Sequence, residues 1–195
     1  LICNMRSKDY GKVEIVYEAG LELISREGIA GLTMKGLAAR SGVATGTLYI
    51  YFRSKEELFH RMYLYYRNRS LDRFMQGYDP VEPFRIGLKK VFVNYLTHRI
   101  EHHSESIFLE QYYRSPYITE EQNALAEAMK HPVYEVIKRG KREMLIKNDI
   151  DDEMLFLAMI GFVRELADEH VTKQYKMTPE RIEKAFQLAW DMIKM

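Results

Sequence analysis

The segment Ala44–Leu58, ATGTLYIYFRSKEEL, places an isoleucine between two tyrosines directly after a Thr-Gly-Thr triplet. In a short helix, Leu48 and Phe52 are four residues apart and can share one buried face. At 3.6 residues per turn, Ile50 then points almost directly away from that face. The segment therefore predicts a helix that buries one side and presents an apolar side chain on the other.

Capping residues predict how the chain continues on both sides of this helix. Thr33 can cap a short helix before it, and Ser41–Val43 (Ser-Gly-Val) makes a tight turn between the two. An earlier helix is expected to stop at Gly28. Ser54 can cap the helix that follows, with two glutamates in its first turn, where the helix dipole favours acids. Three short helices and a capped long one form a helix-turn-helix arrangement.

The rest of the chain is also predicted to be helical, with no strand ladder or repeat. Asp79-Pro80 is expected to open a helix, with Pro80 at its first position. Asp151 and Thr178 are expected to cap the last two helices. The fold class is therefore all-α, with about nine helices. We expect a three-helix helix-turn-helix domain at residues 5–53, a connecting helix at residues 54–77 and a larger helical domain at residues 78–195.

Composition narrows the class of protein. Of the 195 residues, 47% are hydrophobic and 29% are charged, which is enough apolar material for a core. Cys3 is the single cysteine, which excludes an intramolecular disulfide and fits a cytoplasmic location. No apolar run approaches the roughly 18 residues that a membrane span needs, so no membrane partner is expected.

Charge is distributed unevenly along the chain and points to an anionic partner. Residues 1–70 carry a net charge of +4 and residues 71–195 a net charge of −3. A helix-turn-helix unit places its second helix in the major groove of DNA, and here that helix is Thr45–Phe52. Double-stranded DNA is therefore the expected partner.

The residues of this helix suit contact with DNA. Thr45 and Thr47 offer hydroxyls, Gly46 allows the backbone to approach closely, and the hydroxyls of Tyr49 and Tyr51 can reach phosphates. Two further positions can contribute from outside the helix.

Those two positions are Lys55 and Thr33, each at the start of a helix whose amides can bind a phosphate.

The exposed Ile50 has two interpretations. It can contact the C5-methyl of thymine, or it can pack with both tyrosines against a neighbouring helix.

Several motifs in this part of the chain closely resemble the DNA-binding domain of the tetracycline-repressor (TetR) family, over roughly residues 9–63. They are Thr33–Ala38 (TMKGLA), Ser41–Val43 (SGV), Gly46–Tyr49 (GTLY), Tyr51-Phe52 and Ser54–Phe59 (SKEELF). The resemblance implies a homodimer that binds a palindromic operator and a C-terminal domain that holds a small-molecule inducer. It implies DNA contacts at Thr33, Ala44, Thr45, Gly46, Thr47, Tyr49, Ile50, Tyr51 and Lys55.

Two residues depart from the family's pattern. Ala44 stands where the family often has a serine, and Thr45 stands where a lysine or arginine is frequent. Both departures remove potential contacts to phosphates or bases, so affinity is expected to depend more on Lys55 and on a basic N-terminal arm that carries Arg6, Lys8 and Lys12.

Aromatic residues of the larger domain are candidates for a ligand cavity between helices. The alternative is that they form plain core. The candidate ligand-binding residues are Phe92, Tyr95, Phe108, Gln111, Tyr112, Phe156, Met159 and Phe162.

The last helix carries apolar residues on two sides, which predicts burial by more than one neighbour. The resemblance implies a dimer built as a four-helix bundle from the last two helices of each copy. The alternative is burial of both sides within one subunit. The candidate interface residues are Ala158, Gly161, Phe186, Ala189, Trp190 and Ile193.

Metal binding is weighed at His98 and His102, which are four residues apart, with His103 adjacent. A site also needs a third ligand on another element, such as His131 or His170. Surface histidines are the preferred interpretation, and no metal or cofactor is expected.

Taken together, these features predict a one-component transcriptional regulator, acting as a repressor that an inducer releases from DNA. One alternative is a DNA-binding regulator that responds to no ligand. Another is a helical small-molecule carrier that does not bind DNA. No phosphate-binding glycine loop, nucleophile elbow or paired carboxylates point to catalysis, so an enzyme is not expected.

Overall fold

The computed structural model describes the backbone of residues 2–173 and 175–195, and the side chains from residue 11 onward within those ranges. In this part of the chain there are nine α-helices and a single isolated β-bridge, between Ile146 and Lys194. The prediction of an all-α protein with about nine helices is therefore confirmed. None of the described helices is long and apolar enough to cross a membrane.

The chain folds into two compact units. The first comprises residues 1–68 and 104–120, and the second comprises residues 69–103 and 121–195. This division differs from the predicted consecutive domains, because residues 104–120 belong with the first unit.

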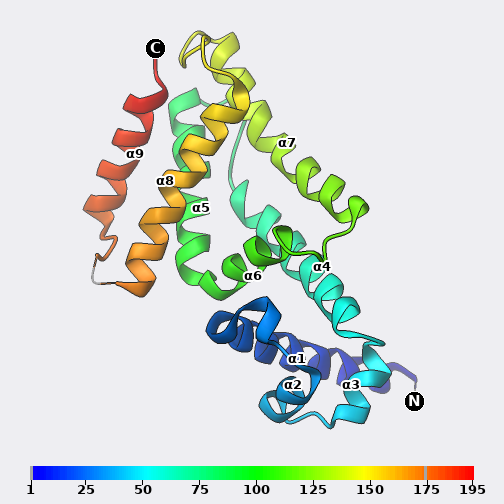
Figure 1. The fold of residues 1–195 in the computed structure, drawn as a ribbon. Helices are drawn as coiled ribbons and strands as arrows, with labels where there is room; N and C mark the ends of the chain where they lie inside the picture. Colours follow the sequence, from blue (N-terminus) through cyan, green and yellow to red (C-terminus); the bar gives the residue numbers. More distant parts are fainter. Residues whose placement is uncertain (1, 174) are drawn as a thin grey trace. The chain divides into compact units, whose positions relative to one another are not determined.

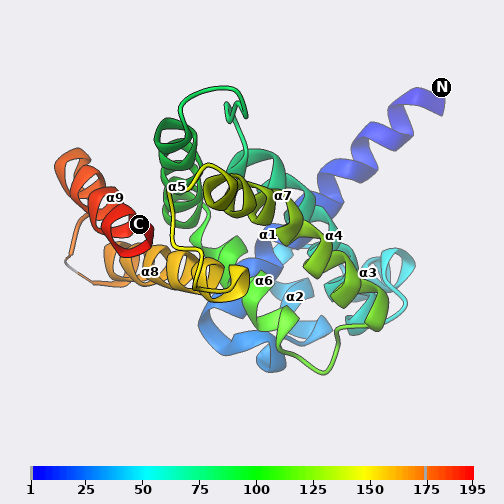
Figure 2. The same ribbon diagram turned by 90° about the horizontal axis from the view of Figure 1, so that it is seen from above.

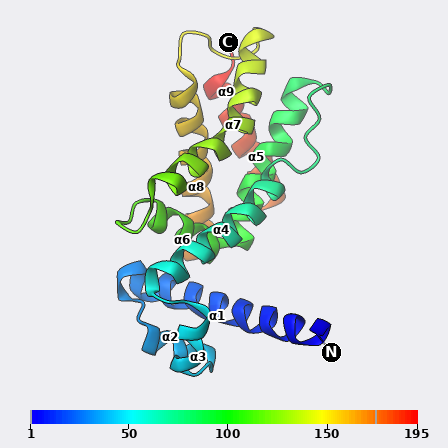
Figure 3. The same ribbon diagram turned by 90° about the vertical axis from the view of Figure 1, so that its right-hand side faces the viewer.

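The first unit contains the helices nearest the N-terminus and one helix from further along the chain. Figure 3 shows α2 and α3 beside α1, and α2 contacts both of them. The helices are α1 (Ile2–Gly31), α2 (Met34–Ser41), α3 (Thr45–Tyr51), most of α4 (Lys55–Phe74) and nearly all of α6 (His103–Tyr113).

A break in α1 occurs at Gly28, where a helix stop was predicted. Gly28 has φ 74° and ψ 168°, a conformation that favours glycine, and helix resumes as far as Gly31. The N–H of Ile29 after the break donates to Oε1 of Gln111 at 2.8 Å. A side chain of α6 thus satisfies a backbone donor that the break leaves outside the regular helix.

The second unit is a bundle of long helices. Figure 1 shows α5, α8 and α9 side by side, and each of the three contacts the other two. Its core includes Phe84, Phe92, Val136, Phe156 and Phe186. The helices are α5 (Phe84–Glu101), α7 (Glu120–Arg142), α8 (Asp152–Thr172) and α9 (Pro179–Ile193).

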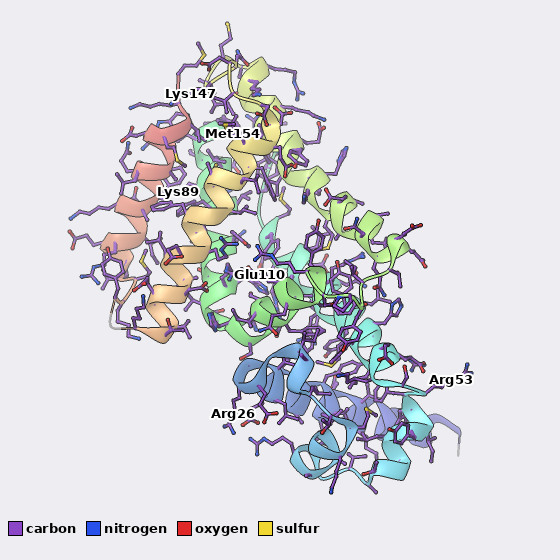
Figure 4. All side chains as sticks on the ribbon, viewed as in Figure 1. Arg26, Arg53, Lys89, Glu110, Lys147 and Met154 are labelled. Atoms are coloured by element: carbon purple, nitrogen blue, oxygen red, sulfur yellow. The ribbon has the colours of Figure 1, made fainter. Side chains whose placement is uncertain are left out.

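Close packing stabilises this bundle, and an exposed ion pair joins two of its helices. A Cβ built on Gly140 would lie 2.9 Å from Cε2 of Phe84, so α7 approaches α5 closely only because residue 140 is glycine. Lys89 of α5, labelled in Figure 4, pairs with Glu183 of α9.

The predicted helix caps are confirmed at both ends of the chain. Thr33, Asp151 and Thr178 each accept a hydrogen bond from the backbone N–H three residues ahead. Ser54 accepts from the N–H of Glu57 at 3.2 Å in the same way.

The predicted start at Asp79-Pro80 is wrong, because α5 begins at Phe84. Pro83 disfavours helical backbone at Glu82, the residue before it, so the helix cannot extend further toward the N-terminus. Asp79 instead closes a turn, in which its Oδ1 accepts from the N–H of Val81 at 2.9 Å.

Candidate DNA-binding surface and ligand cavity

The turn between α2 and α3 is set by Gly42 and Ser41. Gly42 ends α2 in the left-handed conformation, with φ 71° and ψ 9°, which costs glycine little. Oγ of Ser41 donates to the carbonyl of Leu37 at 2.7 Å and accepts from the N–H of Val43 at 3.3 Å. These bonds fix the direction in which α3 leaves the turn.

Two buried residues anchor α3 in the first unit. Leu48 and Phe52 have no exposed surface, as the four-residue spacing predicted. Ala44 stands at the N-cap without a side-chain hydrogen bond, in line with its short apolar side chain. The orientation of α3 therefore depends on its buried face rather than on its cap.

The opposite side of α3 is open. Ile50 is 81% exposed and Tyr49 is 51% exposed, while Tyr51 is partly buried. Within the described part of the chain, Ile50 therefore does not pack against a neighbouring helix. Ala44, Thr45 and Gly46 are exposed at the start of α3, and Thr47 is partly buried. The outward apolar side chain that the sequence predicted is present.

Arg53 and Glu57 tighten the connection from α3 into α4. The backbone N–H of Arg53, labelled in Figure 4, donates to Oε2 of Glu57 at 2.8 Å. This bond is the main cause that lowers the pKa of the Glu57 carboxyl. Together with the bond from Glu57 to Ser54, it resembles a capping box, and it places Lys55 in the first turn of α4.

Lys55 lies over two aromatic rings. Its Nζ is 5.6 Å from the ring centroid of Phe59 and 5.5 Å from that of Tyr117, and these two rings are 5.2 Å apart. Contacts of this kind restrain the ammonium by cation–π attraction. Tyr117 was not predicted as a neighbour of Lys55, because the two residues are distant in the sequence and no local pattern indicates their contact.

Residues of α6 predicted to bind ligand belong instead to the first unit. Phe108 contacts Phe59 with ring centroids 6.4 Å apart, and Tyr112 stacks on Tyr63 at 4.8 Å. Gln111 is occupied by its bond to α1. Phe108, Gln111 and Tyr112 therefore do not line the cavity described next.

A cavity of about 180 Å³ lies within the second unit. Its wall comes from the end of α4 and from α5, α7 and α8; the last three are seen together in Figure 2. Of the predicted ligand-binding residues, Phe92, Tyr95, Phe156 and Met159 line it. Phe162 does not line it, and lies against Phe92 with ring centroids 6.5 Å apart.

The predicted interface residues divide between buried and accessible positions. Phe186, Ala189 and Ile193 are at most 2% exposed, and they pack into the core of their own unit. Trp190 packs against the same core and is partly buried. Ala158 and Gly161 on α8 are partly exposed, and a Cβ on Gly161 would meet no atom within 4 Å.

The second apolar side of α9 is accessible, as are neighbouring positions of α8. Leu188 is 62% exposed and Met192 is 39% exposed. Met154, labelled in Figure 4, and Leu157 are 56% and 53% exposed on α8. Burial of both sides of α9 within one copy of the chain is therefore wrong.

His98 is a buried residue of α5. Its Nε2 lies 3.1 Å from Oγ of Ser70 and its Nδ1 lies 3.4 Å from Nη1 of Arg73. Burial is the main cause that lowers its pKa to about 3, and the charges of His102, Arg73 and Arg99 act in the same direction. Because a guanidinium only donates, the neutral ring accepts at Nδ1 and donates from Nε2 to Ser70.

The histidines do not assemble a metal centre in the described structure. His103 contacts Oδ1 of Asp168 at 3.1 Å. Among the side chains that the structure describes, no three His, Cys, Asp or Glu residues are grouped as metal ligands.

Both parts of the chain match models of one protein family. Residues 16–62 match the model described as bacterial regulatory proteins, tetR family. Residues 83–194 match the model of a tetracyclin repressor-like C-terminal domain.

The chain also resembles individual proteins along nearly its whole length. An uncharacterized HTH-type transcriptional regulator from Haemophilus influenzae is 23% identical over 194 residues, which cover 97% of this chain and 100% of that protein. The crystal structure of a TetR family transcription regulator from Marinobacter aquaeolei VT8 superposes with a TM-score of 0.86 at 23% identity, covering 97% of this chain and 98% of that chain. A TetR family protein from Vibrio parahaemolyticus superposes with a TM-score of 0.75 at 25% identity, over 94% and 99% of the two chains.

Proposed function

Because this chain belongs to the TetR family of DNA-binding transcriptional regulators, we propose that it is a homodimeric repressor that a small molecule releases from a palindromic operator. The observation that carries the proposal is the structure of α3. A buried Leu48 and Phe52 hold this helix, and an exposed row that includes Tyr49 and Ile50 faces outward. As a repressor it acts on DNA in the cytoplasm, and its family consists of regulators rather than enzymes.

Members of the TetR family dimerise, and we assign the dimer contact to the accessible sides of α8 and α9. Met154, Leu157, Ala158 and Gly161 recur at helical spacing on α8, and Leu188 and Met192 do so on α9. Exposed apolar rows on adjacent helices favour an interface between copies. A two-fold dimer then supplies two recognition helices for two half-sites.

The cavity supports a response to ligand rather than a regulator that works without one. One end of α4 carries Lys55 near the DNA-binding helix, and the other end carries Phe74 in the cavity wall. The ring of Phe74 contacts Tyr95 and His98, each with centroids 5.0 Å apart. A ligand that displaces Phe74 shifts α4, and it releases DNA if it binds the DNA-incompetent state more tightly.

The direct test is binding of the purified protein to the DNA that flanks its own gene, across a salt series. Scrambled DNA of equal length is the control. Selective binding with a steep salt dependence is expected. Equal affinity for both DNAs would contradict a regulator of that gene.

We predict that Lys55→Ala weakens binding to every DNA sequence by a similar factor. The variant removes one phosphate contact in each copy of the dimer, so the slope of log affinity against log salt should fall by about 2. The matched control is Lys138→Ala, an exposed lysine of α7 in the second unit. An unchanged slope, or a loss of dimerisation in the Lys55 variant, would contradict the assignment.

We predict that Ile50→Ala relaxes the preference for one thymine in the operator. Replacing that thymine with deoxyuridine removes the methyl, and it should cost the parent about 1 kcal/mol and the variant almost nothing. Ile15→Ala, at a 50% exposed isoleucine of α1, is the matched control. If deoxyuridine costs both proteins the same at every position, Ile50 does not contact a methyl group.

A further inference from the structure

The wall of the cavity in the second unit is almost entirely hydrocarbon. Among the described residues that line it, all except Tyr95 and Lys130 have aliphatic, phenyl or thioether side chains. Val91, Val136 and Val163 are nearly fully buried members of this wall. An occupant therefore gains mainly by removing apolar surface from water.

The volume limits the size of that occupant. The cavity measures about 180 Å³. A dry protein cavity of roughly 150 Å³ lined by similar side chains holds a benzene molecule. The present cavity therefore suits a single ring with a small substituent, or an aliphatic molecule of similar bulk.

Lys130 is the one charged residue among the described residues of the wall, and it is already paired with acids. Its pairing affects which charge a ligand can carry. Nζ of Lys130 lies 2.9 Å from Oε2 of Glu127 and 3.8 Å from Oε1 of Glu153. A carboxylate on the ligand would compete with these two acids and be repelled by them. No acid is among the described residues of the wall, so an ammonium would have to displace Lys130 from these same two acids or remain unpaired, and an unpaired buried charge is costly.

We propose that the cavity selects a compact, uncharged, apolar molecule of about the size of a substituted single ring. This inference rests on the proposed function, in which the occupant of the cavity is the inducer. It adds the chemical class of that inducer, for which carboxylates and amines of the same shape are poor substitutes.

The test compares four probes that share one heavy-atom skeleton and differ in polarity and charge: cumene, benzamide, benzoate and benzamidine. Each is titrated into the full chain, without DNA, by isothermal calorimetry. Cumene should bind at least about tenfold more tightly than either ion, because it leaves no charge to desolvate. Benzoate or benzamidine binding as tightly as cumene would overturn the proposal.

Cavity-filling variants locate the binding site. Ile160→Phe on α8 and Val91→Phe on α5 add bulk to the lining from two different helices, and each should lower cumene affinity at least about tenfold. Val81→Phe, at an 87% exposed position, should change nothing. Circular dichroism checks that each variant is folded. If a variant does not fold, the titrations of the parent protein with the four probes still test the proposal. Undiminished cumene binding in both folded filling variants would place the site elsewhere.

A substitution of Lys130 tests whether its charge takes part in ligand recognition. Lys130→Met should leave cumene affinity equal or higher, with Lys138→Met on the same helix as the control. A tenfold loss of benzoate affinity in Lys130→Met alone would show that Lys130 recognises an anionic ligand, and would overturn the uncharged class.

A parallel DNA-release assay separates this inference from the proposed function. Cumene that binds the free protein but leaves DNA binding unchanged supports the ligand class and contradicts the role as inducer. Selective DNA binding without any cumene binding supports the regulator and contradicts the ligand class.

Discussion

Replacing Leu188 with glutamate is expected to turn the dimer into monomers. Leu188 is 62% exposed in the single chain, so the substitution leaves the fold of each copy intact. In a two-fold interface it would bury a carboxylate from each copy against apolar surface, at a cost of several kcal/mol. The dimer dissociation constant should rise at least about 100-fold, which sedimentation velocity can measure over a concentration series.

Operator binding should fall in the same variant, because the two recognition helices are no longer linked and each must bind its half-site alone. Val81→Glu places the same charge at an exposed position of the same unit and should remain dimeric. A dimer that survives Leu188→Glu would exclude this face of α9 from the interface.

Phe108→Ala is expected to destabilise the first unit by about 3–5 kcal/mol, the usual cost of truncating a fully buried phenylalanine. Phe108 has no exposed surface, and its ring contacts Phe59, Tyr66 and Tyr112. DNA binding should be lost as the unit unfolds, although Phe108 lies far from α3 in the sequence. Chemical denaturation measures the free energy of unfolding, and hydrogen exchange should localise the loss of protection to α1–α3, the part of α4 in the first unit, and α6.

The control is Tyr113→Ala, the 39% exposed neighbour of Tyr112 on α6, which should cost much less. The prediction also separates two roles for Phe108. If Phe108→Ala weakens binding of an apolar ligand and leaves stability unchanged, the residue belongs to a ligand site, as the sequence suggested.

The features that were predicted well depend on interactions between residues close in the chain. Thr33, Ser54, Asp151 and Thr178 cap helices through bonds to N–H groups three residues ahead. The buried and exposed faces of α3 were also predicted correctly, because they follow from the helical period. One wrong prediction could have been avoided by a local rule, because Pro83 disfavours helical backbone at the residue before it and so opposes the earlier start expected for α5.

Patterns between residues close in the sequence do not predict the unit to which α6 belongs. Its aromatic residues are of the types that line ligand cavities, but the same residue types also fill protein cores. The sequence alone therefore does not distinguish a cavity wall from a core. Tertiary contacts assign α6 to the first unit, among them those with Phe59, Tyr63 and the backbone of Ile29. Those contacts join residues about fifty to eighty positions apart.

For the two sides of α9, the sequence pattern predicts which residues share a face, and packing determines which face is buried. The sequence correctly predicts that both sides are apolar, which follows from helical spacing alone. The predicted dimer interface included Phe186, Ala189 and Ile193. In the structure these residues fill the core, and Leu188 and Met192 are exposed. Periodicity determines which residues share a face. The direction of that face depends on the helices that pack against it, and those are brought together by the fold of distant segments.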